Sequence, residues 1–280
     1  MLEMLNLSFM MSALLASLVI GFLLSYLGIH VVGRGIVFVD LALGQISSLG
    51  VAFAGFLHFG ENWLPIVFTL LGAILLSFIH IRDKRLRLEA VIGIIYVVAA
   101  AVTVLVISKT PHGEADISEV LFGTLLAVSA EELRNLAIVF AVLGILHFFF
   151  RKHIFRVTQM MEKKEMLAFT TKDKAWNFFF YLSIGLAIVF AVRIGGVLPV
   201  FAYLVVPAVS AIMVARRRLW LVLITFFNMA VASFFGLWFS YTFDFPAGPS
   251  IVALFGVIFS ISAIIRLIWI KSGWTNVSEN

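Results

Sequence analysis

The sequence predicts an all-α fold, a polytopic bundle of membrane-spanning helices. Of its 280 residues, 62% are hydrophobic and 12% are charged, whereas soluble domains average about 45–50% apolar and about 25% charged residues. The apolar residues are gathered into nine segments, most of them near the roughly 20 residues that a helix needs to cross a bilayer. Short connections separate these segments, so residues 1–280 are predicted to form a single transmembrane domain.

Each apolar segment is interpreted as a helix, because backbone groups inside lipid must find their hydrogen bonds within the segment itself. In chain order the predicted spans are Phe9–Val32, Ile36–Leu57, Trp63–Ile81, Ala90–Ile107, Leu136–Phe150, Trp176–Val192, Gly196–Ala215, Leu219–Tyr241 and Ser250–Ile270. The first ten residues lack the Lys or Arg of a cleaved signal peptide, so the first span is expected to be retained. The alternative is an eight-span bundle, in which Leu136–Phe150 is lost or the first two segments merge.

The basic residues predict how the bundle sits in the membrane. Arg216, Arg217 and Arg218 end one span, and clustered Arg and Lys mark the cytoplasmic side. With that end fixed, all of the 20 Lys and Arg fall on the cytoplasmic side except Lys109, Arg134 and Arg193. We therefore expect a multi-pass protein of the cell (inner) membrane, with its N-terminus outside and its C-terminus in the cytoplasm.

Several classes of activity are excluded by missing motifs. The sequence contains no cysteine, which rules out disulfides, thiolate metal ligands and a cysteine nucleophile. It also lacks a GxxxxGK[ST] loop, an HExxH pair and a GxSxG elbow. Any ATP must therefore be bound by another subunit, and no cofactor is expected on this chain. The net charge of +5 follows from the topology, so no nucleic-acid partner is predicted.

The second segment carries a polar stripe in an otherwise apolar helix. Asp40, Gly44 and Ser47 share one helical face, and Gln45 and Ser48 share the adjacent one. A charge in hydrocarbon costs roughly 2.5–3.5 kcal/mol on insertion scales and persists where it has a partner or a function. Carboxylate, amide and hydroxyl oxygens are suited to a cation that sheds part of its water. The alternative interpretation is that Asp40 pairs with Arg34 near the inner interface.

The stretch from Gly195 to Leu221 is the second candidate region. Pro199 and Pro207 interrupt an uncharged span, and each removes a backbone donor, so neighbouring side chains must satisfy the freed carbonyl groups. The span contains Tyr203 and ends at the arginine triplet described above, with almost no loop before the next span. Such an elbow is suited to transmit a push from a cytoplasmic partner, although an ordinary inside-facing hairpin is the alternative.

The longest outside segment, Pro111–Arg134, holds five acidic residues and one arginine. Its inner part, Val120–Val128, is apolar but too short to span, and we expect a re-entrant or surface-lying helix. Ser129 and Glu132 have the spacing of a capping box at the start of the next helix. An acidic outer vestibule would attract cations, whereas a solvated loop is the alternative.

Four stretches together resemble the permease subunits of ABC-type importers of zinc, manganese and iron. They are VGRGIVFVDLALGQISSLGVAFA; EAVIGIIYVVAAAVTVLVIS with ADISEVLFGTLLAVSAEEL; GGVLPVFAYLVVPAVSAIMVARRRLWLVL; and YTFDFPAGPSIVALFGVIF. The resemblance covers Leu14 to Ile265 in the same order. It implies a homodimer that docks on separate ATPase subunits and receives metal from an extracytoplasmic solute-binding protein.

The resemblance also implies roles for individual residues. Residues from Pro207 to Arg218 would lie in or beside the segment that couples to the ATPase. The translocation pathway would include Asp40, Gln45, Ser48 and Tyr203. The family signature usually reads GDALSHA, whereas here Gln45 stands at the histidine position and Asp40 is offset by one. Imidazole favours zinc, while oxygen ligands suit manganese and similar harder ions.

The predicted function is transport of a divalent metal ion by alternating access, with zinc first and manganese or iron next. An ABC permease for a siderophore, cobalamin or haem is the main alternative. A secondary transporter would need no ATPase. An intramembrane enzyme would need a facing catalytic pair, for which the sequence offers Asp40 and Glu89.

Overall fold

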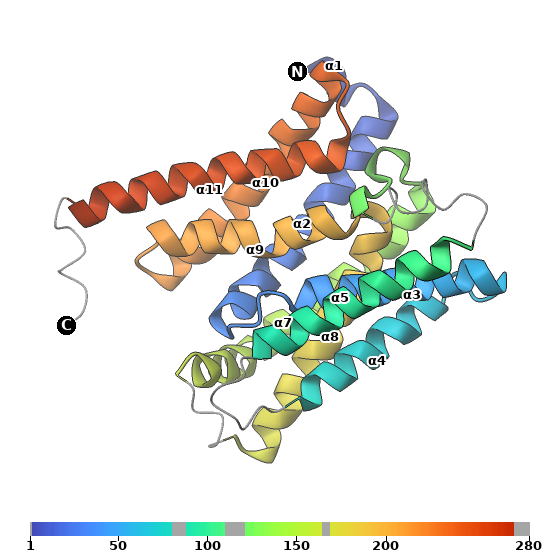
Figure 1. Cartoon of the computed structure of the whole chain (residues 1–280). Coiled ribbons are helices and arrows are strands. Elements are labelled where there is room, and N and C mark those ends of the chain that lie inside the picture. Colours follow the sequence, from blue (N-terminus) through green and yellow to red (C-terminus); the bar gives the residue numbers. More distant parts are fainter. Residues whose placement is uncertain (1, 80–87, 110–120, 164–168, 272–280) are drawn as a thin grey trace.

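The computed structural model describes residues 2–79, 88–109, 121–163 and 169–271, and these contain helices and no strand. Figure 1 shows the helices packed side by side into one bundle. The elements are α1 (Leu2–Leu5), α2 (Ser8–Gly33), α3 (Val39–Leu57), α4 (Leu64–Phe78), α5 (Leu88–Ile107), the 3₁₀ turn η1 (Leu125–Ala127), α7 (Ala130–Glu162), α8 (Thr171–Gly195), α9 (Val197–Val214), α10 (Arg218–Phe243) and α11 (Ala247–Lys271).

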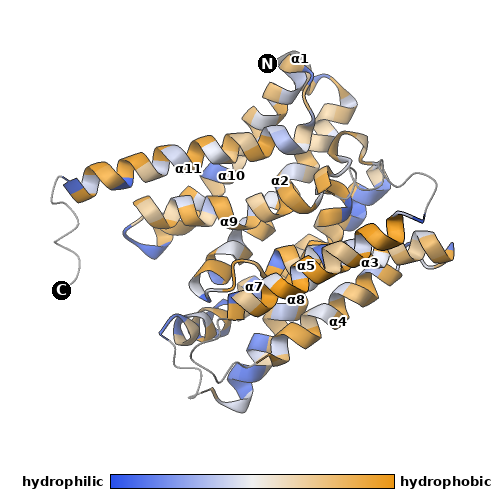
Figure 2. Cartoon of the chain, in the orientation of Figure 1, coloured by the Kyte–Doolittle hydropathy of each residue, from blue (hydrophilic) through white to orange (hydrophobic). Residues whose placement is uncertain are grey.

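The all-α membrane fold is confirmed, and each predicted span corresponds to a helix. Eight of the described helices are long and apolar enough to cross a membrane. The ninth, α4, has 15 described residues, and the last two residues predicted for that span lie outside the described part of the chain. Figure 2 shows hydrophobic residues along the helices and hydrophilic ones concentrated at helix ends and connections.

The boundaries of α7 differ from the sequence prediction. We expected a span over Leu136–Phe150, but the helix has 33 residues and continues from Ala130 to Glu162. Basic residues such as Arg151 and Lys152 end the apolar run without ending the helix, because backbone hydrogen bonds do not depend on apolar side chains. A capping box between Ser129 and Glu132 is present at the start of α7, as predicted.

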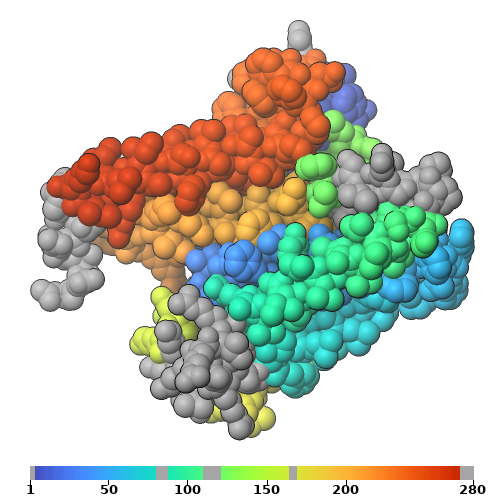
Figure 3. Space-filling model, viewed as in Figure 1, coloured from blue at the N-terminus to red at the C-terminus, as the bar shows by residue number. Residues whose placement is uncertain are grey.

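Two helices form the centre of the bundle. In the most apolar 18-residue stretch of α2 and of α8, 67% of the residues are buried, whereas the figure is 17% in α11 and 22% in α5. Helix α2 packs against α7, α8, α9 and α10, while α8 packs against α3, α4 and α7. On the face seen in Figure 3, α11 lies across α9, and α5 lies near α4.

Helices α2 and α9 cross with almost no space between their backbones. A Cβ atom added at Gly28 would stand 1.7 Å from the carbonyl oxygen of Leu204, far inside van der Waals contact. Small residues permit such close crossings in membrane proteins. Glycine at position 28 is therefore required by the packing of these two helices.

The described part of the predicted re-entrant segment lies against the turn between α8 and α9. Residues 121–128 contain the short turn η1 rather than a spanning helix. The Thr124 amide donates to the carbonyl of Ile194 at 3.0 Å. Gly123 and Gly196 meet there with φ values of 73° and 77°, which glycine adopts without strain.

Candidate functional site

The polar stripe of α3 is buried in the bundle. The exposed fractions are 2% for Asp40, 4% for Gln45, 2% for Ser47 and 1% for Ser48. A Cβ atom added at Gly44 on the same stripe would lie in ordinary contact with Val192 and Val197, at the junction of α8 and α9. The stripe therefore faces protein rather than lipid, as a functional interpretation requires.

Asp40 is a buried carboxylate without a compensating cation. It occupies the first turn of α3, and neither carboxylate oxygen meets a hydrogen-bond partner at good geometry among the described residues. The helix dipole supplies some stabilisation at this end, which leaves the carboxylate able to accept a further positive group.

The alternative interpretation, in which Asp40 pairs with Arg34, does not hold in the described residues. The Arg34 guanidinium donates from Nε to Thr158 Oγ1 at 3.0 Å and from Nη1 to Asn177 Oδ1 at 2.9 Å. It also stacks on Phe180, with 3.7 Å between the guanidinium carbon and the ring centre. Contacts with α7 and α8, distant in sequence, therefore direct Arg34 away from α3.

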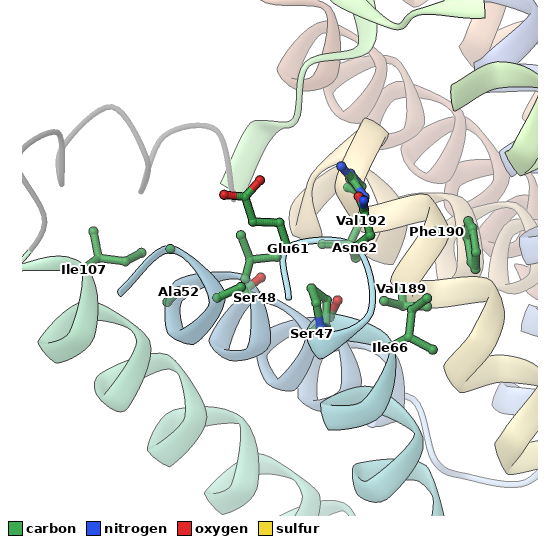
Figure 4. Close-up of a pocket in the computed structure, with 15 residues that line it drawn as sticks. Ser47, Ser48, Ala52, Glu61, Asn62, Ile66, Ile107, Val189, Phe190 and Val192 are labelled. Atoms are coloured by element: carbon green, nitrogen blue, oxygen red, sulfur yellow. The ribbon is translucent and has the colours of Figure 1, made fainter. Parts of the chain in front are cut away.

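A cavity of about 360 Å³ opens at the far end of the stripe. Figure 4 shows it between α3, the connection to α4, and α8, with Ser47 and Ser48 on one wall. Polar groups of Glu61 and Asn62 lie at its margin, and Arg193 Nη1 donates to Asn62 Oδ1 at 3.3 Å. By the predicted topology this cavity opens to the outside.

Sequence reasoning did not identify Glu61 and Asn62 and counted Arg193 only as an exception to the charge rule. These three residues carry no motif, and Arg193 is 131 positions from Asn62. The available signal was their place at the outer ends of neighbouring spans. The acidic vestibule was predicted instead on Pro111–Arg134, most of whose acidic residues lie outside the described residues.

Tyr203 lies in a different part of the bundle from the α3 cavity. Its hydroxyl group is 2.8 Å from Ser233 Oγ of α10, and its ring packs edge-on against Phe255 of α11. It is not among the residues that line the cavity. The structure therefore brings Ser48 to the cavity with Ser47, and buries Tyr203 among α9, α10 and α11.

The two prolines of α9 have different effects. Pro199 lies in the first helical turn, where an amide would have no intrahelical partner. The predicted interruption of the helix at Pro199 is therefore wrong. Pro207 lies inside the helix and frees the carbonyl group of Tyr203, four residues earlier. The buried Ser25 hydroxyl donates to this carbonyl at 3.0 Å, which is the compensation by a neighbouring helix that we predicted.

The elbow between α9 and α10 is as short as the sequence indicated. Helix α9 ends at Val214 and α10 begins at Arg218, so three residues connect them. All three arginines are exposed. Arg216 lies over the Trp269 ring of α11 at 5.6 Å, and Arg218 lies over the Phe155 ring of α7 at 4.6 Å, so the elbow contacts helices on both sides.

A preformed site of metal-ligand side chains is not evident in the described ranges, since no three His, Asp or Glu residues gather there. The groups available near α3 are one carboxylate, one amide and two hydroxyls. Oxygen donors of this kind bind hard divalent cations. Such a set suits transient passage of an ion better than permanent retention.

Three comparisons place the chain among known proteins. The family model described as "ABC 3 transport family" matches residues 6–266. The manganese transport system membrane protein MntC of Listeria monocytogenes is 24% identical over 91% of this chain and 90% of its own length. The manganese import system permease protein ScaB of Streptococcus gordonii is 26% identical over 92% and 91%.

The fold also matches solved structures. PsaBC from Streptococcus pneumoniae, solved in complex with a Fab, superposes with a TM-score of 0.78 at 24% identity, covering 93% of both chains. An inward-facing putative metal-chelate type ABC transporter gives 0.70 at 17% identity, covering 91% of this chain and 85% of the other. With a family model that matches almost its whole length, the chain belongs to the ABC 3 transport family.

Proposed function

We propose that this protein is the permease of an ATP-driven importer whose cargo is a divalent metal ion, with manganese favoured. As a family member it is a transport subunit, and ATP is hydrolysed on a separate subunit. The similar proteins MntC and ScaB are named for manganese transport. These names support a metal ion as cargo over a siderophore, cobalamin or haem.

The single observation that carries the proposed ion path is the buried, unpartnered carboxylate of Asp40. An uncompensated carboxylate is costly inside a bundle, and an ionisable group there marks an ion pathway by default. We propose that the ion enters at Ser47 and Ser48, passes Gln45 and meets Asp40. A path of oxygen donors without imidazole favours manganese over the zinc predicted first.

The partners follow from this path and from the elbow. We propose that a solute-binding protein delivers the ion to the outer cavity beside Glu61, and that two copies of the chain form the transport unit. The ATPase would contact the elbow at Arg216 and Arg217, whose charge suits an acidic docking surface. Closure of the ATPase pair would then move α9 through the segment that follows Pro207.

Uptake by the reconstituted complex tests the ion and the path together. Proteoliposomes that contain the permease, its ATPase and its binding protein should accumulate radiolabelled Mn²⁺ when ATP is present. We expect Asp40→Asn to lower the uptake rate at least tenfold, because it keeps the shape of the side chain and replaces the ionisable carboxyl group with a neutral amide. Asp244→Asn, at the exposed C-cap of α10, is the matched control and should retain uptake.

Three results would contradict the proposal. Full uptake by the Asp40→Asn complex would remove Asp40 from the path. Transport of an iron chelate in preference to free ions would favour the siderophore alternative. Uptake by vesicles that lack the ATPase would identify a secondary transporter.

A further inference from the structure

A second cavity, a groove of about 860 Å³, lies between α2, α7 and α10. It is separate from the cavity beside α3 and shares none of its lining residues. Its walls are almost entirely apolar, with Phe22 and Leu23 from α2, Phe140 and Phe148 from α7, and Phe226 from α10. Apolar residues of its lining, such as Phe22, Phe148 and Leu219, are exposed on the protein surface, so we expect the groove to open toward lipid.

One end of this groove is cationic. Arg151 of α7 and Arg218 of α10 both line it. Each guanidinium group lies 4.6 Å from the centre of an aromatic ring, Arg151 over Phe148 and Arg218 over Phe155. No carboxylate in the described parts of the chain lies within ion-pair distance of either arginine. The aromatic rings hold the two cations in place and leave their donors free for an anion.

Two further donors without a hydrogen-bond partner belong to α2 and to the residue that follows it. The Tyr26 hydroxyl lines the same groove, and it is buried with no hydrogen-bond partner among the described residues. Arg34 is only 5% exposed, its Nη2 also lacks a partner, and its bound neighbours Thr158 and Asn177 are neutral. Arg34 does not line the groove, but a buried cation without a counter-charge is costly, so its charge at the same end of α2 adds to the preference for an anion.

The cationic end of the groove lies at the end of the bundle that the arginine elbow marks. Arg218 is the first residue of α10, and Arg34 follows the end of α2. Under the predicted topology this is the cytoplasmic end, where anionic lipids give the leaflet a negative surface potential. Basic pockets between helices on this side bind anionic lipid headgroups.

We propose that this groove binds an anionic phospholipid of the cytoplasmic leaflet, with its phosphate on Arg151 and Arg218 and an acyl chain along the apolar walls. A single anionic phospholipid matches both the cationic end and the apolar walls of the groove. Guanidinium groups donate paired hydrogen bonds to phosphate oxygens. An apolar helix from a second copy would fill the walls and leave both arginines without a counter-charge, so a lipid fits better.

Native mass spectrometry of the purified complex tests headgroup selection. The complex is loaded with phosphatidylglycerol or phosphatidylcholine of identical chains, and wild type should retain the anionic lipid preferentially. Each of Arg151→Gln and Arg218→Gln should weaken retention about fivefold, the equivalent of about 1 kcal/mol per basic residue near an anionic lipid. Arg266→Gln, an exposed arginine on α11, is the matched control and should change nothing.

A photoreactive phosphatidylglycerol tests the location on wild-type protein, independently of any substitution. Labelled peptides should come from α2, α7 and α10, and Val222→Trp should reduce labelling by filling the groove. Equal retention of both lipids, or labelling elsewhere, would overturn the proposal. So would efficient disulfide cross-linking of Val222→Cys between two copies in membranes, since the chain has no other cysteine.

Discussion

At the scale of single residues, the clearest compensation lies between α2 and α9. Proline inside a membrane helix leaves a carbonyl oxygen that water cannot reach. Here the Tyr203 carbonyl receives the Ser25 hydroxyl instead of an amide. The hydroxyl of α2 thus replaces the backbone donor that Pro207 lacks.

This replacement predicts a specific pattern in a double-mutant cycle. Ser25→Ala should lower the free energy of unfolding by roughly 1 kcal/mol, because it leaves a buried acceptor unsatisfied. In a Pro207→Ala background the amide of residue 207 can donate to the same carbonyl, so Ser25→Ala should then cost little. Unfolding in detergent, followed by circular dichroism, measures both values. Equal costs in the two backgrounds would show that the hydroxyl serves another purpose.

Residue-level predictions succeeded where the information is local. The capping box needs only the spacing of Ser129 and Glu132 and was predicted correctly. The partner of Arg34 could not be predicted, because Thr158 is 124 positions away and only tertiary packing brings it close. For Asp40, burial was predicted from its apolar surroundings, whereas its lack of a compensating cation appears only in the structure.

At the scale of elements, the crossing of α2 and α9 determines the core of the bundle. Gly28→Ala places a methyl group against the Leu204 carbonyl, and the helices must separate. We expect a loss of about 2–3 kcal/mol of stability, as for other overpacked cores. The control is Gly256→Ala in α11, where nothing lies within 4 Å of the added carbon. Since alanine is the better helix former by up to about 1 kcal/mol, Gly256→Ala should be neutral or stabilising.

Thermal unfolding of both variants in the same detergent provides the comparison. A Gly28→Ala protein as stable as Gly256→Ala would mean that the two helices do not cross this closely in the folded protein.

The positions of the helices were predictable because the length of an apolar segment identifies a span. The residues at which helices begin and end were harder to predict. Helix α7 begins six residues before its predicted span and ends twelve residues after it. Its start is fixed by the Ser129 cap and its C-terminal part is a polar extension, which hydropathy does not detect. The prediction that Pro199 interrupts the span is wrong for a related reason, since the effect of a proline depends on how far it lies from the start of the helix.

At the scale of the whole molecule, the orientation in the membrane remains a prediction. The absence of native cysteine makes it directly testable with single substitutions. A membrane-impermeant maleimide added to intact cells should label Phe59→Cys, in the connection after α3. It should label Lys152→Cys, in α7, only after the membrane is permeabilised. The opposite pattern would reverse the topology and also the proposed leaflet of the lipid.

Coupling to the ATPase is tested at the elbow. We expect Arg217→Glu to reduce ATP-driven uptake by at least tenfold, because it places a negative charge where a cationic docking surface is proposed. The protein should still insert and unfold as wild type does, since Arg217 is exposed. Arg217→Lys, which keeps the charge, is the control and should retain most uptake. Normal transport by Arg217→Glu would leave the elbow an ordinary hairpin.

Much of the whole-molecule description could be obtained from sequence, because the bilayer imposes strong rules on length and charge. What it could not supply is which helices meet. The cavity beside α3 depends on Asn62 lying beside Arg193, and the proposed lipid groove depends on Arg151 and Arg218 lining the same cavity. No periodicity in the chain encodes either pair.

The close contact of α2 and α9 has a mechanical consequence. The Leu204 carbonyl group lies against Gly28, and the Ser25 hydroxyl group donates to the adjacent Tyr203 carbonyl. These contacts oppose both sliding and rotation of α2 against α9. We therefore expect the two helices to move as one body, so that a displacement at the elbow end of α9 is carried into α2. At Gly44 of α3 an added Cβ would make only ordinary contact with valines of α8 and α9, so packing is looser there, and Asp40 lies one helical turn earlier on α3.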